Sequence, residues 1–271
     1  MPELPEVETI VRDLRRQLPG RKIARVELGR RQVLKTPPQK IARVLEGATI
    51  EAVERWGKNI VLRASNGGPL WWVIHLGMSG RLTVDLASRQ RRAHTHGVFT
   101  LDPGREELRY TDARMFGRIE VSREMPVRLK MLGPDPLEVS EEDFVVRLRS
   151  RRARLKALLL DQRFLRGVGN IYADESLFRA GIHPKALGSR ISRARAGLLY
   201  RTLQEVLTQA IESRGSSVRD YVDGRGEAAR FQFEHRVYGR AGEICPQCGK
   251  RLKGAIVAGR GTTFCIKCQK R

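Results

Sequence analysis

The sequence predicts an α+β fold, with an N-terminal β-sandwich and flanking helices, a helical region, and a C-terminal β-hairpin that carries four cysteines. Three observations predict it. Strand-like runs separated by turn residues fill positions 49–122, helical periodicity dominates positions 141–214, and all four cysteines lie at or after position 245. A chain of 271 residues is long enough for two domains with separate cores.

Two helices are expected in the N-terminal region. Apolar residues recur with the i, i+3, i+4, i+7 spacing of an amphipathic helix over residues 5–18, which ends before Pro19-Gly20. A second short helix is expected over residues 38–46, closed by Gly47. The residues that share the apolar face of the first helix are Val7, Ile10, Val11, Leu14 and Leu18.

The segment that follows these helices has the pattern of closely spaced strands. Seven short runs are separated by Gly, Asn, Asp or Pro turns. Strands with this spacing favour a β-sandwich, with the first helix packed along it. The runs are residues 49–53, 60–63, 70–76, 81–86, 97–101, 107–110 and 118–121.

A break in the pattern separates the two halves of the chain. Gly133-Pro134-Asp135-Pro136 interrupts every periodicity, which places the interdomain linker near residues 126–140. Helices are expected beyond it over residues 141–149, 152–161, 169–180 and 192–214, followed by a Gly-rich loop over 215–226. The expected domains are residues 1–130, a linker with the first helix over 131–150, a helical domain over 151–232, and the cysteine module over 233–271.

The charge balance points to a polyanionic partner. The chain has 52 Lys and Arg residues against 30 Asp and Glu residues, a formal net charge of +22. Such an excess is typical of proteins that bind nucleic acid, whose counterions are released on binding. No membrane partner is expected, because no stretch pairs a basic face with a long apolar one, and the apolar run 71–74 is too short to cross a bilayer. The N-terminus lacks the features of a secretory signal, so we expect a cytoplasmic protein, and we expect it to be a monomer.

The four cysteines predict a metal site in a reducing compartment. Cys245-x2-Cys248-x16-Cys265-x2-Cys268 has the spacing of a four-thiolate zinc site. Four protein ligands close the coordination shell, so one structural Zn²⁺ is expected. The residues between the pairs can form a β-hairpin whose tip presents Arg260 among glycines, where the backbone can approach a phosphate closely. The alternative is an ordinary solvent-exposed arginine.

Pro2-Glu3 is a second candidate site. If Met1 is removed, the mature chain begins with a secondary amine that can attack an electrophilic carbon and form an iminium, with an acid side chain beside it. The alternative is that Pro2 and Pro5 only open the helix, since proline suits the first helical turn.

Glycines before a helix form a third candidate site. In Gly167-Val168-Gly169-Asn170 they leave backbone N–H groups that can bind an anion. Any helix start can show the same pattern, so it does not by itself distinguish an anion-binding site from an ordinary helix start.

A set of motifs runs from one end of the chain to the other. They are Met-Pro-Glu-Leu-Pro-Glu-Val-Glu-Thr at the start, His75-Leu76-Gly77-Met78-Ser79-Gly80, Tyr110-Thr111-Asp112 through Phe116-Gly117, Leu132-Gly133-Pro134, residues 167–177, and Val237-Tyr238-Gly239-Arg240. In this order they resemble the bacterial formamidopyrimidine-DNA glycosylase family. The resemblance implies that residues 167–177 form a helix–two-turns–helix motif within a DNA-binding domain, and that the cysteine module is a zinc finger.

The resemblance implies a bifunctional DNA repair enzyme, a glycosylase and AP lyase. Such an enzyme excises oxidised purines (8-oxoguanine and formamidopyrimidines) from double-stranded DNA after flipping the nucleotide out, then cuts the abasic site by β,δ-elimination. Pro2 is implied as the nucleophile that forms a Schiff base with C1′, and Glu3 as the acid that assists base loss and ring opening. Lys58 is implied as a phosphate contact and proton donor for β-elimination, and Arg260 as the arginine of δ-elimination.

The same resemblance assigns residues that contact DNA. Met78, Arg114 and Phe116 would fill the space left by the extruded base, with Arg114 facing the orphaned cytosine. The family often shows Asp-Pro-Arg-Arg-Phe-Gly where this chain has Asp112-Ala113-Arg114-Met115-Phe116-Gly117, a departure that leaves the arginine in place. The implied DNA-binding residues are His75, Met78, His94, Arg114, Phe116, Arg151 or Arg152, Asn170 and Tyr238, and the loop over 215–226 would recognise the oxidised base through Ser216, Val218, Arg219, Asp220 and Tyr221.

Two other functions compete with this one. An endonuclease VIII-type enzyme would act on oxidised pyrimidines, but such chains typically begin Met-Pro-Glu-Gly-Pro and this one has Leu4. A non-enzymatic DNA-binding protein would use the basic surface and the zinc finger without the amine, and a retained Met1 would favour it. Taken singly, Met78 and Phe116 fit a core as well, and the loop over 215–226 fits a linker.

Overall fold

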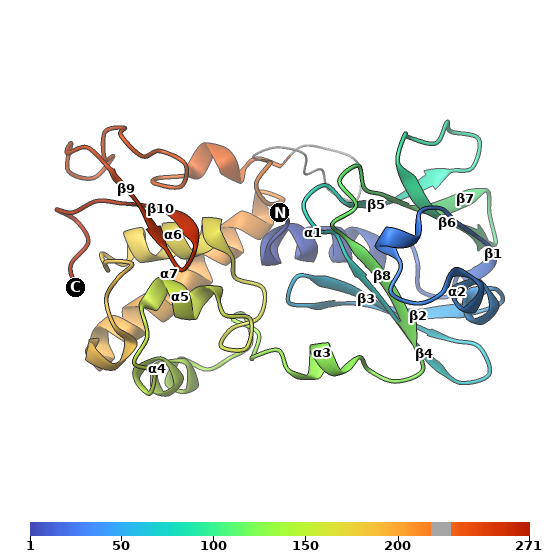
Figure 1. Cartoon of the computed structure of the whole chain (residues 1–271), viewed down its shortest axis with the longest axis horizontal. Coiled ribbons are helices and arrows are strands. Elements are labelled where there is room, and N and C mark those ends of the chain that lie inside the picture. Colours follow the sequence, from blue (N-terminus) through green and yellow to red (C-terminus); the bar gives the residue numbers. More distant parts are fainter. Residues whose placement is uncertain (218–228) are drawn as a thin grey trace. The chain divides into compact units, whose positions relative to one another are not determined.

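The structure is a computed structural model that describes residues 1–217 and 229–271 and forms two compact units. One unit consists of Met1–Lys130 and Ser213–Arg230, and the other of Met131–Glu212 and Phe231–Arg271. Figure 1 shows the elements of each. The division into four segments expected from the sequence stays a prediction.

The N-terminal unit begins with α1 (Leu4–Arg15), whose start is set by its first residues. Pro5 lies in the first turn, where it has no N–H to lose, and the Glu6 carboxylate accepts the backbone N–H of Glu3 at 2.7 Å. The helix ends earlier than predicted, but the N–H of Leu18 still bonds the carbonyl of Leu14 at 2.9 Å, so Leu18 stays in the core. The other helical segments are η1 (Arg31–Val33), α2 (Pro38–Leu45) and α3 (Val127–Lys130).

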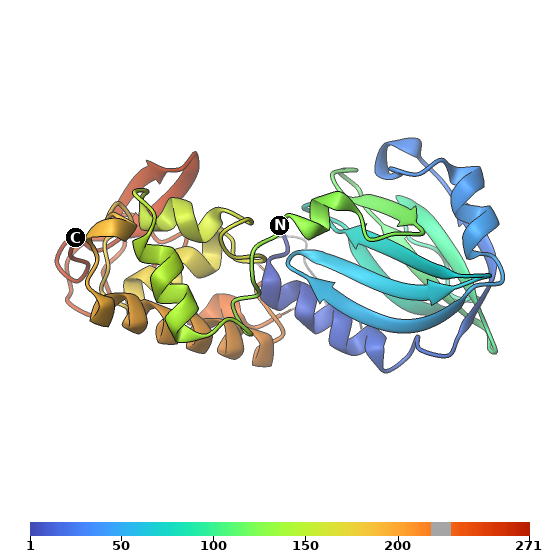
Figure 2. The same cartoon turned by 90° about the horizontal axis from the view of Figure 1, so that it is seen from below.

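Eight antiparallel strands form one continuous sheet in the order β5-β7-β6-β1-β2-β3-β4-β8. All seven predicted strands are present, and the eighth, β1, lies between β6 and β2. Helix α1 packs along β2 and β3 (Figure 2). The strands are β1 (Lys22–Leu28), β2 (Thr49–Trp56), β3 (Asn59–Ser65), β4 (Pro69–His75), β5 (Arg81–Leu86), β6 (Thr95–Asp102), β7 (Glu106–Thr111) and β8 (Arg118–Ser122).

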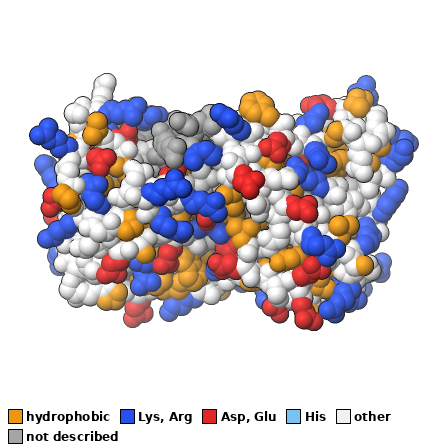
Figure 3. All heavy atoms as spheres, turned by 180° about the vertical axis from the view of Figure 1, so that it is seen from behind, with side chains coloured by type: hydrophobic (Ala, Val, Ile, Leu, Met, Phe, Trp, Pro, Cys, Tyr) orange, Lys and Arg blue, Asp and Glu red, His pale blue; other side chains and the backbone are white. Residues whose placement is uncertain are grey.

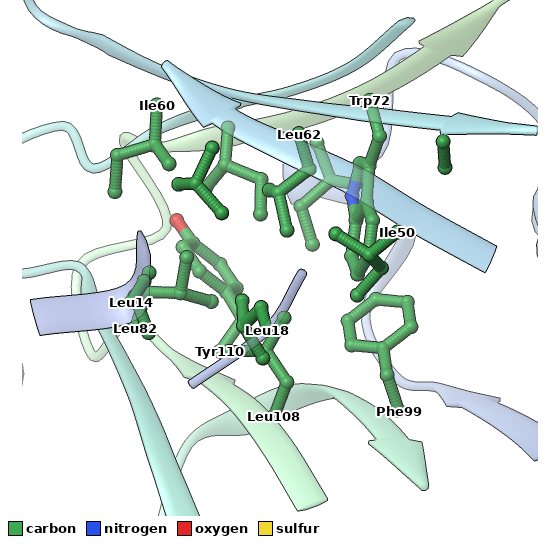
Figure 4. Close-up of a cluster of buried hydrophobic side chains, with 14 of the residues drawn as sticks. Leu14, Leu18, Ile50, Ile60, Leu62, Trp72, Leu82, Phe99, Leu108 and Tyr110 are labelled. Carbon is green, nitrogen blue, oxygen red and sulfur yellow. The ribbon is translucent and has the colours of Figure 1, made fainter. Parts of the chain in front are cut away.

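The sheet folds over onto itself, and the core lies between its two halves. Trp72 on β4 and Phe99 on β6 have ring centroids 4.4 Å apart, although three strands lie between β4 and β6 in the sheet. In a flat sheet these strands would lie about 19 Å apart. Figure 4 shows Ile60 and Leu62 facing Tyr110 across this core. The predicted sandwich is therefore made by one curled sheet.

A segment from late in the sequence, residues 213–217, completes this unit and is called the strap below. The backbone N–H of Ser216 donates to Glu6 Oε1 at 2.7 Å, and the Arg214 guanidinium forms an ion pair with the buried Asp13. Both acids lie on α1, seven residues apart, so the strap runs along one face of that helix. The strap is also hydrogen-bonded to residues 229 and 230: the N–H of Ala229 donates to Ser217 Oγ at 2.8 Å, and the N–H of Arg230 donates to Ser213 O at 3.0 Å.

The second unit contains the remaining helices and the cysteine module. Ser140 caps α4 (Glu141–Arg149) by accepting the N–H of Asp143 at 3.1 Å. The helix predicted over 152–161 begins later, because residues 151–154 are held by backbone contacts instead: Arg154 bridges Leu187, and the N–H of Ser189 bonds the carbonyl of Arg151. Among the described residues no helix is both long enough and apolar enough to cross a bilayer. The elements are α4 (Glu141–Arg149), α5 (Leu155–Leu160), α6 (Asn170–Arg179), η2 (Gly188–Arg190), α7 (Arg193–Glu212), η3 (Phe231–Glu234), β9 (Lys253–Val257) and β10 (Arg260–Phe264).

Candidate active site and nucleic-acid interface

Pro2 and Glu3 are buried at the start of α1, where Glu6 fixes the backbone. One oxygen of the Glu6 carboxylate accepts the N–H of Glu3, and the other accepts the N–H of Ser216, each at 2.7 Å. Glu6 therefore ties the N-terminal end of the chain to the strap. The sequence offered a signal for this, since Glu3-x-x-Glu6 has the spacing of a capping box.

Lys58 is largely buried in the turn between β2 and β3, next to Gly57, whose φ is +60°. An ion pair of 2.7 Å between Arg55 Nε and Glu8 Oε2 joins the end of β2 to α1. Burial raises the pKa of Glu8, but the charges and hydrogen bonds of Arg55 and Arg12 together outweigh it, so this pKa lies below its ordinary value. This pair links the helix that follows Pro2 and the strand that leads into the turn of Lys58 within one unit.

His75 ends β4 close enough to Lys58 for the two charges to interact. Burial, followed by the charges of Arg118 and Lys58, lowers the pKa of His75 to about 4, so the ring is neutral near pH 7. The backbone N–H of Gly77 donates to His75 Nδ1 at 3.1 Å. We therefore assign the ring proton to Nε2, which leaves a hydrogen-bond donor suited to a phosphate oxygen.

The fully buried carboxylate of Asp112 organises two loops of the sheet. Its Oδ1 accepts from Ser79 Oγ at 2.7 Å and from the backbone N–H of Arg114 at 3.3 Å. Its Oδ2 accepts from the N–H of Gly117 at 2.8 Å and from the Tyr110 hydroxyl at 3.2 Å. Burial and the charge of Asp112 raise the pKa of Tyr110, which keeps its hydroxyl a donor. Asp112 stands in a predicted motif, but the sequence did not indicate this role.

Glycines let the same two loops touch backbone to backbone. A Cβ added to Gly77 would lie 2.5 Å from the backbone N of Gly117, and a Cβ on Gly117 would lie 1.9 Å from the Tyr110 hydroxyl. Any side chain at either position would separate the loops. The loops 76–80 and 112–117, called the paired loops below, are therefore locked in register.

The paired loops present the three residues expected to replace an extruded base. Phe116 is 59% exposed although it is a large apolar side chain, and the Arg114 guanidinium lies 4.8 Å from the centre of its ring. Met78 is partly exposed, and His94, with φ +63°, lies in the adjacent loop, where its carbonyl accepts the N–H of Asp112. The structure thus brings Met78, Arg114, Phe116 and His94 to neighbouring loops of one unit.

In the second unit, the tip of the hairpin β9–β10 is held by side chains of α5 and α6. Lys156 is 0% exposed, and its Nζ donates to Gly261 O at 3.1 Å and to Thr262 Oγ1 at 2.7 Å. The same Nζ lies 2.7 Å from Asp174 Oδ1, and burial raises the pKa of Asp174 to about 6. The side-chain amide of Asn170 also donates to Gly261 O, at 2.9 Å. Lys156 and Asp174 were not among the predicted site residues.

Glu175, the next residue of α6, holds the segment that leads into the cysteine module. Its buried carboxylate accepts the backbone N–H groups of Arg236, Val237 and Tyr238 at 2.9–3.0 Å. Tyr238 is therefore fixed relative to the start of α6, where Asn170 lies.

The four cysteines fit a zinc ion. Their ligand atoms lie within 4.8 Å of one another, with Sγ–Sγ distances of 3.9 Å for Cys245–Cys268 and 3.5 Å for Cys248–Cys265. Four sulfurs at about 2.3 Å from a tetrahedral zinc would lie about 3.8 Å apart. The backbone N–H of Lys250 lowers the pKa of Cys248 to about 7, toward the thiolate that binds metal, whereas burial raises the pKa of Cys245 and Cys268. The predicted structural zinc site is confirmed.

The remaining predicted residues fall into three groups: exposed, buried, and outside the described residues. Arg151, Arg152 and Arg260 are exposed, whereas Ser216 is buried in the strap. Lys and Arg side chains are scattered over the face in Figure 3. Val218, Arg219, Asp220 and Tyr221 lie outside the described residues.

Comparison with known proteins decides the family. Residues 1–119 match the formamidopyrimidine-DNA glycosylase N-terminal domain, residues 132–222 its H2TH domain, and residues 242–271 the zinc finger found in FPG and IleRS. The formamidopyrimidine-DNA glycosylase of Solibacter usitatus is 51% identical, over 100% of both chains.

The chain belongs to the formamidopyrimidine-DNA glycosylase family. The predicted family is thereby confirmed, and the fold agrees with it. A structure of a Lactococcus lactis FPG mutant in complex with a Fapy-dG containing DNA has a TM-score of 0.90 at 34% identity and covers 100% of both chains. A complex of Lactococcus lactis Fpg with an abasic site containing DNA has the same TM-score at 33% identity, covering 99% of this chain and 100% of that one. The roles of individual residues stay predictions.

Proposed function

We propose that this formamidopyrimidine-DNA glycosylase family member excises oxidised purines from duplex DNA and cuts the resulting abasic site, with the amine of Pro2 as nucleophile. The observation that carries the proposal is the fixed position of Pro2, buried at the start of α1 beside Glu3, in a chain whose relatives bind Fapy-dG and abasic-site DNA. It acts as a monomer on the genome of a bacterial cell, in the cytoplasm.

The chemistry follows from a secondary amine next to an acid. The Pro2 nitrogen forms a bond to C1′ as the bond from C1′ to the base nitrogen breaks, and the proton that the Pro2 nitrogen releases balances the proton that the departing base takes up. Glu3 delivers a proton to the ring oxygen, so the sugar opens and the C1′–nitrogen bond becomes an iminium. The permanent positive charge of this iminium acidifies the C2′–H bond, so that loss of this proton to a base expels the 3′-phosphate. Loss of a further proton from C4′ then expels the 5′-phosphate.

The other predicted residues contact the DNA backbone and the base pairs of the duplex. Lys58 supports β-elimination, and the Nε2–H of the neutral His75 donates to a phosphate oxygen. Arg114 takes the place of the lost base opposite cytosine, supported by the ring of Phe116. Arg260 supports δ-elimination from the tip of the zinc finger.

Borohydride trapping tests the role of Pro2. We expect the protein to become covalently attached to a duplex carrying 8-oxoguanine opposite cytosine, because borohydride reduces the iminium to a stable amine. A cleavable extension before Pro2 should abolish trapping, and its removal should restore it in the same preparation. Efficient trapping by the uncleaved protein would contradict the proposal, and equal trapping on thymine glycol would point to the pyrimidine-directed alternative.

A further inference from the structure

The zinc ion leaves one end of the finger hairpin without metal support. Cys265 directly follows β10, so the metal fixes the base of the hairpin. Arg260 lies five residues before Cys265, a distance of about 17 Å along an extended strand. A hairpin of two strands is only marginally stable by itself. The position of Arg260 therefore depends on contacts at the tip.

The turn at the tip increases this dependence. Ala258 and Gly259 both have positive φ, +52° and +69°, as a two-residue hairpin turn requires. For alanine this conformation is costly, so surrounding contacts must stabilise it.

Each of the three residues after Arg260 is held by α5 or α6. Gly261 O accepts from Lys156 and Asn170, the Thr262 hydroxyl accepts from Lys156, and the backbone N–H of Thr263 donates to Asp174 Oδ2 at 3.1 Å. Lys156 has the largest share, since it contacts two of the three and pairs with Asp174.

A lysine is unusual at a fully buried position if its side chain only fills space. A fully buried ammonium is costly unless it is paired and hydrogen-bonded, and here the backbone of the tip supplies one of its acceptors. If the hairpin shifted by one residue, Lys156 would lose both Gly261 O and Thr262 Oγ1. The buried charge thus disfavours other registers of the tip.

We propose that Lys156 is a positioning residue that sets the register of the finger tip and thereby the position of Arg260. The consequence for elimination rests on the proposed function, whereas the consequence for the hairpin does not. Zinc binding and tip alignment are then separate tasks of the finger, one performed by the cysteines and the other by α5 and α6.

The first test measures the hairpin without DNA. In Lys156→Met, hydrogen–deuterium exchange in the peptide 255–264 should rise by about tenfold or more, while the peptide with Cys245 and Cys248 stays unchanged and one zinc per chain remains bound. Lys253→Met is the matched control, because it removes the same charge from an exposed position of the same hairpin. Unchanged exchange at the tip, or loss of zinc together with the increase, would overturn the proposal.

The second test measures the products on abasic-site DNA. Lys156→Met should lower the ratio of δ- to β-elimination products by about tenfold, as we also expect for Arg260→Ala, because a displacement of about 1 Å is enough to cost a reaction step. Borohydride trapping should stay within about twofold of the parent protein, since Pro2 is untouched. A parent-like product ratio would overturn the proposal, whereas a parent protein that neither traps nor cuts would contradict the proposed function instead.

A double variant guards against misfolding of Lys156→Met. Lys156→Met with Asp174→Asn removes both buried charges and keeps the shape of the acceptor for Thr263 N–H. It should bind zinc and show the same two changes. A double variant with parent-like exchange and product ratio would also overturn the proposal.

Discussion

Two exposed arginines, Arg114 and Arg260, are held in place by opposite means. The paired loops carry Arg114 and rely on one buried carboxylate, neutral hydrogen-bond donors and backbone contact between glycines. The finger tip carries Arg260 and relies on charges, a zinc site at the base of the hairpin and the Lys156–Asp174 pair at its tip.

The difference follows from what surrounds each arginine. The paired loops connect strands of an eight-stranded sheet, which already restrains their ends. The finger hairpin has two strands and little apolar area of its own, so it needs cross-links. We therefore expect the first region to be sensitive to shape and the second to be sensitive to metal and charge.

The largest expected effect is steric and confined to the paired loops. In Gly117→Ala the new Cβ would lie 1.9 Å from the Tyr110 hydroxyl and 2.6 Å from the carbonyl of His75. We expect a loss of roughly 3 kcal/mol or more in the free energy of unfolding. All three tryptophans, Trp56, Trp71 and Trp72, belong to the N-terminal unit, so tryptophan fluorescence in urea reports on it selectively.

A glycine of the finger supplies the control for this substitution. Gly261 has no heavy atom within 4 Å of an added Cβ. Gly261→Ala should change the free energy of unfolding of the second unit by less than about 0.5 kcal/mol, followed by circular dichroism because the tryptophans report only on the N-terminal unit. Equal losses in the two variants would remove the distinction between a region sensitive to shape and one that is not.

Zinc removal should have the next largest effect and should act only on the finger. A chelator that removes one zinc per chain should weaken binding to duplex DNA by at least about tenfold, because the base of the hairpin loses its cross-link. The tryptophan-monitored unfolding of the N-terminal unit should not move. Unchanged DNA affinity after verified zinc loss would contradict a role for Arg260 in phosphate contact.

The smallest expected effect is the pH dependence of the stability of the N-terminal unit. The pKa of His75 is about 4 in the folded protein against 6.5 for the ordinary residue, so between these values the unfolded chain binds more protons and stability falls as the pH falls. Between pH 7.5 and pH 5 this group should cost on the order of 1 kcal/mol, discounted for its partial exposure. His75→Gln should flatten that dependence, and the exposed His94→Gln should not. A parallel slope in all three proteins would show that His75 carries no such cost.

The elements that were predicted correctly have local patterns. Helix α1 and the seven strands follow from apolar periodicity and turn residues, and the zinc site follows from cysteine spacing. β1 was missed because only Ile23 is buried among its seven residues, so the alternation is weak. The start of α5 was wrong because residues 151–154 find backbone partners near Leu187, far along the chain.

The site was predicted only where a motif marked it. Lys156 bonds Thr262 across 106 residues, and Asp112 joins its own loop to Ser79, 33 residues away in the sequence. No local pattern can indicate such a pair. Glu6 is different, because its capping-box spacing to Glu3 was visible, although its bond to Ser216 was not.

The strap has a consequence for the order in which the two units can fold during synthesis. The N-terminal unit is discontinuous, since residues 213–217 and 229–230 belong to it while α4 to α7 are encoded in between. A ribosome releases the sheet early, but Asp13 and Glu6 meet Arg214 and Ser216 only after four helices of the other unit have emerged. Most of the second unit must therefore be synthesised before the N-terminal unit can fold completely. A fragment that stops at residue 130 lacks Arg214 and Ser216, the partners of Asp13 and Glu6 on α1.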